Sequence, residues 1–185
     1  NEFFDLLSTT FYYTFFGTIG SIVFGILTAQ LVNQKFFGRT FMRSVLLFPY
    51  VGPVVALAYT WELLLDPYSG TLNNLLMNFQ VIQEPLNLLG QKYLIINFFG
   101  FDLKLRLALT TVIIFEIWRY FPLAFLFILA RLQAVPKELY EAAEVDGAGP
   151  LQKFTNITLP QITAVISILF MIRFIWNFNK FEDIF

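Results

Sequence analysis

The 185-residue sequence contains no cysteine and no histidine. The usual zinc ligands, thiol nucleophiles and imidazole bases are therefore missing, and the redox compartment cannot be read from cysteine usage. The sequence has no G-x-x-x-x-G-K-S/T motif, so if ATP is used, its phosphate-binding loop belongs to another polypeptide. Basic patches interleaved with aromatic residues are absent too, which argues against nucleic acid as a partner. We therefore predict no catalytic residue, metal site or cofactor within this chain.

Charge is absent from the first long apolar run, since no acidic or basic residue lies between Leu6 and Gln34. Hydrophobic residues make up 57% of the chain, with 24 phenylalanines and a mean hydropathy of +0.67. A soluble domain of this size cannot bury so much apolar surface. A bilayer core of ~30 Å needs about 20 helical residues, which the uncharged run supplies. The sequence therefore predicts a multi-pass membrane protein.

We predict an all-α transmembrane domain, with a single domain over residues 1–185. Four spanning helices are predicted, near 10–33, 44–64, 106–131 and 160–180. Pro49, Gly52 and Pro53 interrupt the second, and such a break is tolerated only where neighbours or water satisfy the freed carbonyls, so we expect a kink inside a bundle. Because the chain begins with Asn1 rather than Met, we expect a fragment of a subunit with about six spans.

The distribution of lysine and arginine predicts the orientation. The link after the first span carries Lys35, Arg39 and Arg43, and is predicted to be cytoplasmic. The stretch from Glu62 to Lys104 has four acidic residues against two lysines, so the connection at 65–105 is predicted to be external. The basic residues Arg131, Lys137 and Lys153 then return the segment at 134–160 to the cytoplasm.

The external connection is long enough to hold structure of its own. A turn signal at 66–70 precedes apolar residues at helical spacing, which predicts a short amphipathic helix. Its apolar face consists of Leu72, Leu75, Leu76 and Phe79, and Asn73, Asn74 and Asn78 lie opposite. Packing of the apolar face against the bundle is the favoured interpretation, and contact with the membrane interface or an external partner is the alternative.

The segment at 134–160 is a polar stretch between two apolar runs. Pro136 suits a first helical turn, Gly147 a helix end and Pro150 a second helix start, which predicts helix, turn, helix. Alanine methyl groups let a partner's backbone approach closely, and glutamates offer carboxylates to basic residues. The pattern indicates a docking site. A solvated connecting loop would explain the composition of this segment but not the spacing of its Glu, Ala, Gly and Pro residues.

This segment resembles the EAA loop of ABC importer permeases. In that family E-A-A is followed after three residues by G, and after nine more by I-x-L-P, and every fixed position is filled here with the same gaps. The segments RSVLLFPYVGP (43–53), WRYFP (118–122) and WNFNKF (176–181) also resemble segments of the maltose, oligosaccharide and glycerol-phosphate importer branch. Lys180 departs from the family pattern, which usually has Asp there, so a role carried over to that position is in doubt.

The resemblance implies a type I ABC importer permease bundle in the inner membrane, translocating a sugar, oligosaccharide or related polyol. It implies as partners a second permease subunit, commonly a paralogue, two cytoplasmic ATPase subunits that bind ATP and Mg, and an external solute-binding protein. Closure of the ATPases would be transmitted through the EAA loop. The implied coupling residues are Glu141, Ala142, Ala143, Asp146, Gly147, Ala148, Leu159 and Pro160.

Ionised residues inside the spans are costly, at least ~2.5 kcal/mol each on insertion scales. Glu116 and Arg119 lie three apart and share a helical face with Tyr120, so an ion pair beside a phenol is feasible. Together with Arg173 these residues are predicted to line a substrate pathway. The alternatives are that they only stabilise the bundle, or that Glu116 and Arg119 relay charge in an ion-coupled secondary transporter. A non-transporting membrane scaffold is a further alternative.

Three residues near the end of the fourth span combine a ring face with amide groups, the mixture that binds sugars. Trp176, Asn177 and Asn179 are predicted to belong to the substrate pathway, with simple packing as the alternative. The first span carries Gly17, Gly20 and Gly25, which let helices approach closely. We predict that this surface binds the second permease subunit.

Overall fold

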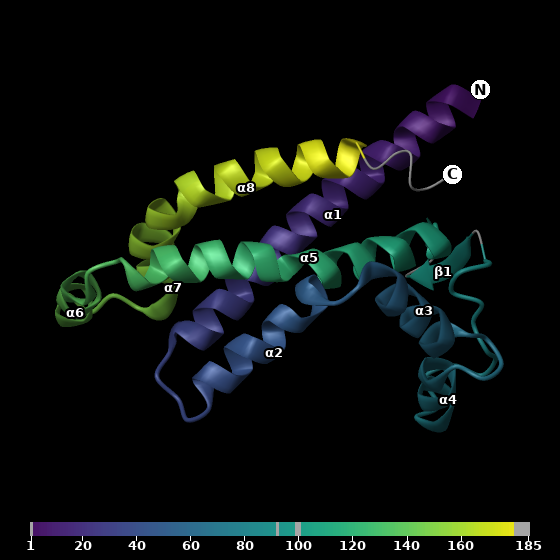
Figure 1. Ribbon diagram of the computed structural model, residues 1–185, viewed down its shortest axis with the longest axis horizontal. Helices are drawn as coiled ribbons and strands as arrows, with labels where there is room; N and C mark the ends of the chain where they lie inside the picture. Colours follow the sequence, from purple (N-terminus) through teal and green to yellow (C-terminus); the bar gives the residue numbers. More distant parts are fainter. Residues whose placement is uncertain (1, 92, 99–100, 180–185) are drawn as a thin grey trace. The chain divides into compact units, whose positions relative to one another are not determined.

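The computed structural model describes residues 2–91, 93–98 and 101–179 (Figure 1). It divides into two compact units, residues 1–50 with 117–185 and residues 51–116. The first unit contains α1 (Glu2–Asn33), nearly all of α2 (Arg39–Val51), the second part of α5 (Leu107–Gln133), α6 (Lys137–Val145), α7 (Pro150–Lys153), the π-helical turn η1 (Phe154–Thr158) and α8 (Leu159–Asn179).

The core of the first unit lies where α1, α5 and α8 meet. α1 and α8 pack against each other. Phe125 and Ile128 of α5 are fully buried in a cluster with apolar residues of α1 and α8. At the end of α5, Arg131 donates to the carbonyl of Gln161 (2.9 Å) and to its side-chain oxygen (2.7 Å). The buried hydrophobic cluster comprises Ile22, Ala29, Val32, Phe121, Ala124, Phe125, Ile128, Leu129, Leu132, Ile162 and Leu169.

The glycines of α1 serve contacts within this chain. A Cβ at Gly25 would lie 2.6 Å from the Cβ of Ala124 and 2.9 Å from the backbone nitrogen of Phe125, so α5 occupies this surface. A Cβ at Gly20 would meet the side chain of Ile117, also on α5. Small residues allow a neighbouring helix to approach closely, and at Gly20 and Gly25 that helix is α5 of the same chain. The prediction that these two glycines bind a second permease subunit is therefore wrong.

Three helical segments are long and apolar enough to cross a membrane: Phe3–Asn33, Leu107–Gln133 and Pro150–Asn179. The pair α2 and α3 (Val54–Leu65) adds a fourth if it is counted as one broken span. The break falls at Gly52 and Pro53, since Pro53 lacks the N–H that would continue the ladder. Three of the predicted spans, near 10–33, 106–131 and 160–180, therefore agree with this structure, as does the predicted interruption of the second, which is a fourth span only if α2 and α3 cross as one.

The second unit contains α3, α4 (Thr71–Asn78), the strands β1 (Leu94–Phe98) and β2 (Phe101–Leu105), and the first part of α5. The strands form an antiparallel pair in which Leu94 is opposite Leu105 and Phe98 is opposite Phe101. The short helix predicted after the turn at 66–70 is confirmed as α4. This strand pair was not predicted from the sequence. The connection at 65–105 therefore differs from the all-α prediction by a small two-stranded sheet.

Asn73 organises that connection. Its side chain is 1% exposed, donates to the carbonyl of Leu86 (2.9 Å) and accepts from the N–H of Leu86 (3.2 Å). Within the same unit Leu75 is 48% exposed and Phe79 76% exposed. The prediction that Asn73 lies on the outward face of this helix is therefore wrong. Its amide can satisfy backbone groups of the following loop, which an apolar side chain cannot do.

Candidate functional site

The segment at 134–160 folds as helix, turn, helix. Helix α6 starts after Pro136 and is closed by Gly147, whose φ of +76° is in the left-handed region. The N–H of Gly147 donates to the carbonyl of Glu144 (3.0 Å), and that of Ala148 to the carbonyl of Ala143 (2.8 Å). These two bonds make a Schellman motif, in which glycine is favoured because a Cβ is strained at positive φ. The predicted helix end at Gly147 is confirmed.

This segment, which we call the coupling segment (residues 134–160), is open to its surroundings. No residue of α6 is buried, Val145 is 89% exposed, and Leu151 of α7 is 74% exposed. Glu141 and Ala142 are exposed and Ala143 is half-buried. Carboxylate, methyl and apolar groups are therefore available together, as docking requires. The other predicted coupling residues are exposed or half-buried: Asp146, Gly147, Ala148, Leu159 and Pro160.

Two side-chain ties join α6 to the segment that leads into α8, one to Lys153 of α7 and one to Thr158 of η1. Nζ of Lys153 lies 2.7 Å from Oε1 of Glu144, and the hydroxyls of Tyr140 and Thr158 are hydrogen-bonded at 3.0 Å. Thr158 closes η1, and its hydroxyl also lies within hydrogen-bond distance of the Lys153 carbonyl (3.4 Å). π-Helical turns are found mostly as single turns near functional sites. Neither the two ties nor the π-helical turn was predicted from the sequence.

A polar cleft of about 220 Å³ separates the end of α1 from the coupling segment. Gln30 and Asn33 line it from α1, and Tyr140 and Lys153 line it from the coupling segment. The coupling segment is therefore not packed flat against α1 here.

The predicted pathway residues Tyr120 and Arg173 meet inside the first unit. The guanidinium carbon of Arg173 lies 3.9 Å from the centre of the Tyr120 ring, a cation–π geometry, and Arg173 is 1% exposed. The guanidinium carbon of Arg119 lies 5.4 Å from the same ring centre. Nε and Nη1 of Arg119 are buried and have no hydrogen-bond partner among the residues that the structure describes.

Asn177 is turned toward α1. Its Nδ2 donates to Oγ1 of Thr18 (3.3 Å), and both side chains are buried. Thr14 and Ser21 lie one turn away on either side of Thr18 and are also 0% exposed. This stripe of hydroxyl groups was not predicted from the sequence, although residues that are three and four positions apart lie on one face of a helix.

Two further predicted pathway residues, Trp176 and Asn179, are not part of the buried contact in the first unit. Trp176 is 46% exposed and Asn179 is exposed, so neither lies in the buried contact between α1 and α8. Glu116 is 4% exposed and belongs to the other unit, on the first part of α5. Lys180, the departure from the family pattern, lies outside the described residues.

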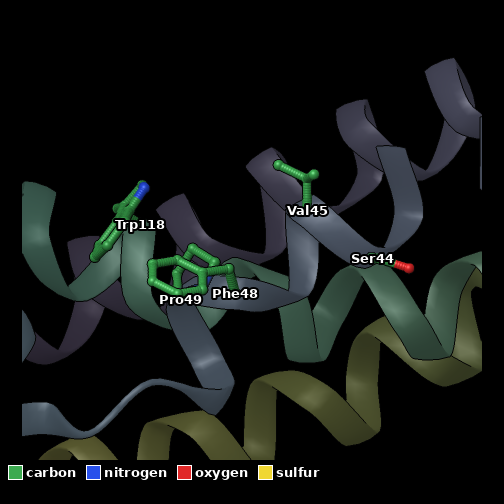
Figure 2. A pocket seen from close by; sticks show the side chains of 5 residues that line it. All are labelled: Ser44, Val45, Phe48, Pro49 and Trp118. Atoms are coloured by element: carbon green, nitrogen blue, oxygen red, sulfur yellow. The ribbon is translucent and has the colours of Figure 1, made fainter. Parts of the chain in front are cut away.

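An open apolar groove of about 490 Å³ lies between α2 and α5 in the first unit. Figure 2 shows Trp118 of α5 near Phe48 and Pro49, with Ser44 and Val45 farther along α2. The Ser44 hydroxyl already donates to the carbonyl of Thr40 (3.3 Å). Because the α2 side of the groove offers so little polarity, we assign it no contact with a polar solute.

Comparison with known proteins gives a consistent result. The family of binding-protein-dependent transport system inner membrane components matches residues 21–181. The inner membrane ABC transporter permease protein YcjO of Escherichia coli strain K12 is 36% identical over 183 residues, which cover 99% of this chain and 58% of YcjO. The trehalose/maltose transport system permease protein MalF of Thermococcus litoralis is 31% identical over 184 residues, 100% of this chain and 57% of MalF.

A solved structure has a similar fold. It is a bacterial alginate ABC transporter in complex with an alginate pentasaccharide-bound periplasmic protein, with a TM-score of 0.72 and 25% identity, covering 90% of this chain and 53% of the matched one. The chain thus spans a little over half the length of the relatives that it matches.

Proposed function

The chain belongs to the family of binding-protein-dependent transport system inner membrane components, and from that premise we propose that it forms part of the permease of an ATP-driven importer. The observation that carries this proposal is the coupling segment. It has the E-A-A, G and I-x-L-P spacing, its Gly147 caps α6 in a left-handed conformation, and its predicted docking residues are exposed or half-buried.

The expected partners follow from this role. Two ATPase subunits would bind ATP and Mg on the cytoplasmic side. They would contact the coupling segment at Glu141, Ala142 and Ala143. A second permease subunit would complete the pathway, and an external binding protein would deliver the solute. The chain has no phosphate-binding motif of its own, which supports a separate ATPase. Membrane helices match such a role, since the family is one of inner membrane components.

The proposed mechanism is alternating access. Closure of the ATPases would move α6, and the two ties at Tyr140 and Glu144 would pass that movement to η1 and α7, which lead into α8. Helix α8 carries Arg173 and Asn177 among the buried polar groups of the first unit. A displacement at the coupling segment can therefore change the environment of these side chains.

The solute is proposed to be a carbohydrate or a related polyol derivative. MalF of Thermococcus litoralis is named for trehalose and maltose, and the similar structure is named for alginate, so related permeases serve carbohydrates. We propose Tyr120, Arg173 and Asn177 as solute-contacting residues, with Glu116, Arg119, Trp176 and Asn179 as further candidates on the pathway.

Uptake into vesicles tests the function. The complete complex in proteoliposomes should import solute with ATP and binding protein, and uptake should persist when ionophores dissipate the ion gradients. Uptake that stops with the gradients and ignores ATP would instead identify a secondary transporter using Glu116 and Arg119. Solute-stimulated ATP hydrolysis would exclude a non-transporting scaffold.

A further inference from the structure

The spanning parts of α5 and α8 carry an excess of positive charge. Arg119 lies near the middle of α5, and Arg173 lies within α8 with 1% of its surface exposed. In the sequences of these two helices Glu116 is the only acidic residue. It can therefore balance at most one of the two guanidinium charges.

Arg119 has unused binding capacity. Its Nε and Nη1 atoms are buried and have no hydrogen-bond partner in the part of the chain that the structure describes. The ring of Tyr120, 5.4 Å away, attracts the charge but leaves these N–H donors unsatisfied. An unsatisfied cation at membrane depth is costly, and such residues mark solute or ion pathways.

The ring of Tyr120 lies near both arginines. Its centre lies 3.9 Å from the guanidinium carbon of Arg173 and 5.4 Å from that of Arg119. An anion beside Arg119 would accept hydrogen bonds from its unsatisfied Nε and Nη1 groups and would offset its charge. Guanidinium groups also bind carboxylate and phosphate oxygens through paired N–H donors, which a neutral hydroxyl cannot match in strength.

We propose that Arg119, with Arg173 and Tyr120, recognises an anionic group on the transported solute, namely a carboxylate or phosphate attached to a carbohydrate or polyol. This deepens the proposed function and rests on it. The competing occupant is a carboxylate of the second permease subunit. That carboxylate would neutralise Arg119 permanently and make uptake indifferent to the solute's charge.

The test compares solutes that differ in one anionic group: glycerol with glycerol 3-phosphate, glucose with glucuronate, and maltose with maltobionate. Each is supplied to the complete complex in proteoliposomes with its binding protein, and ATP-driven uptake is measured for wild type, Arg119→Gln, Arg119→Lys and the control Arg39→Gln. Arg39 is an exposed arginine at the start of α2. Because one binding protein serves all variants, the ratio of variant to wild type isolates the permease.

We expect wild type to import the anionic member of at least one pair. Arg119→Gln should lower kcat/KM for that member by about tenfold or more, Arg119→Lys should retain part of it, and Arg39→Gln should equal wild type. Import of neutral members only, or an equal effect of Arg119→Gln on both members of a pair, would overturn the anion site but leave the importer intact. If Arg119→Gln does not reach the membrane, two measurements still test the anion site. They are the uptake of the anionic against the neutral member of each pair by wild type, and the same comparison for Arg119→Lys. Absence of any ATP-driven uptake by wild type would refute the proposed function itself.

Discussion

The hydroxyl oxygen of Tyr140 lies 3.0 Å from Oγ1 of Thr158, and this contact joins the coupling helix α6 to the end of η1, immediately before α8. Glu144 lies one helical turn after Tyr140 on the same face of α6, and it pairs with Lys153 at 2.7 Å. Two ties on one face resist rotation of α6 about its own axis, whereas a single tie would act as a pivot. We therefore expect α6 to move together with α7 and η1.

Loss of the Tyr140 hydroxyl should weaken coupling. Tyr140→Phe and Thr158→Val each remove one partner of a hydrogen bond worth about 1 kcal/mol, so we expect a severalfold fall in solute imported per ATP hydrolysed. The double variant should be no worse than either single one, because both remove the same bond. The matched control is Thr155→Val, an exposed threonine whose hydroxyl bonds only locally, to Leu151 and Asn156 among its contacts. An unchanged transport ratio in both single variants would refute the role of this tie.

Substitution of Gly147 separates backbone strain from docking. Its φ of +76° disfavours any Cβ, but no atom lies within 4 Å of where the Cβ would be, so a side chain there clashes with nothing in this chain. Asn and Asp both tolerate this conformation better than other residues. We expect Gly147→Asp to insert normally but abolish ATP-dependent uptake, and Gly147→Asn, which lacks the charge, to retain more. Normal uptake by an inserted Gly147→Asp variant would contradict docking at this corner.

Much of this architecture was accessible from the sequence, because it depends on local rules. Hydropathy located the spans, and Gly147 and Pro150 marked the turn of the coupling segment through their own backbone restrictions. The ties of Tyr140 and of Asn177 were not accessible, since they join residues 18 and 159 positions apart. Burial of Asn73 was mispredicted for the same reason, because its partner at Leu86 is 13 residues away.

Labelling from opposite sides tests the orientation. The chain contains no cysteine, so each introduced thiol is unique within it. Ala143→Cys should cross-link to the ATPase and react with impermeant reagents only from the cytoplasmic side. Tyr68→Cys, at a residue 88% exposed in the connection at 65–105, should react only from outside. If the two labelling patterns are exchanged, the predicted topology is reversed and docking of the coupling segment is impossible.

The turn after α3 should be sensitive to acid. Oδ1 of Asp66 accepts hydrogen bonds from the N–H of Ser69 (2.7 Å), the hydroxyl of Ser69 (2.8 Å) and the N–H of Tyr68 (3.0 Å), and the Ser69 bonds foremost lower the pKa of Asp66 below its ordinary 3.8. Because the folded pKa is depressed, this stabilisation is present above the unfolded value and is lost as the pH falls through the folded one.

Amide hydrogen exchange at Tyr68 and Ser69 should therefore accelerate below about pH 4, relative to the intrinsic rate at each pH. Asp66→Asn removes the titrating carboxyl and should make the protection of these amides independent of pH in that range. An equal acid response in wild type and Asp66→Asn would show that another group controls the turn.

Packing of α1 against α5 should tolerate a methyl group at Gly20 better than at Gly25. At Gly25 the added Cβ would lie 2.6 Å from the Cβ of Ala124 and 2.9 Å from the backbone of Phe125, neither of which can rotate away. At Gly20 the obstacle is the side chain of Ile117, which can change rotamer. We expect Gly25→Ala to destabilise the protein by about 1–3 kcal/mol, and Gly20→Ala by clearly less. Thermal unfolding of the purified complex in one detergent measures both, and equal losses would mean that the helices separate as easily at either position.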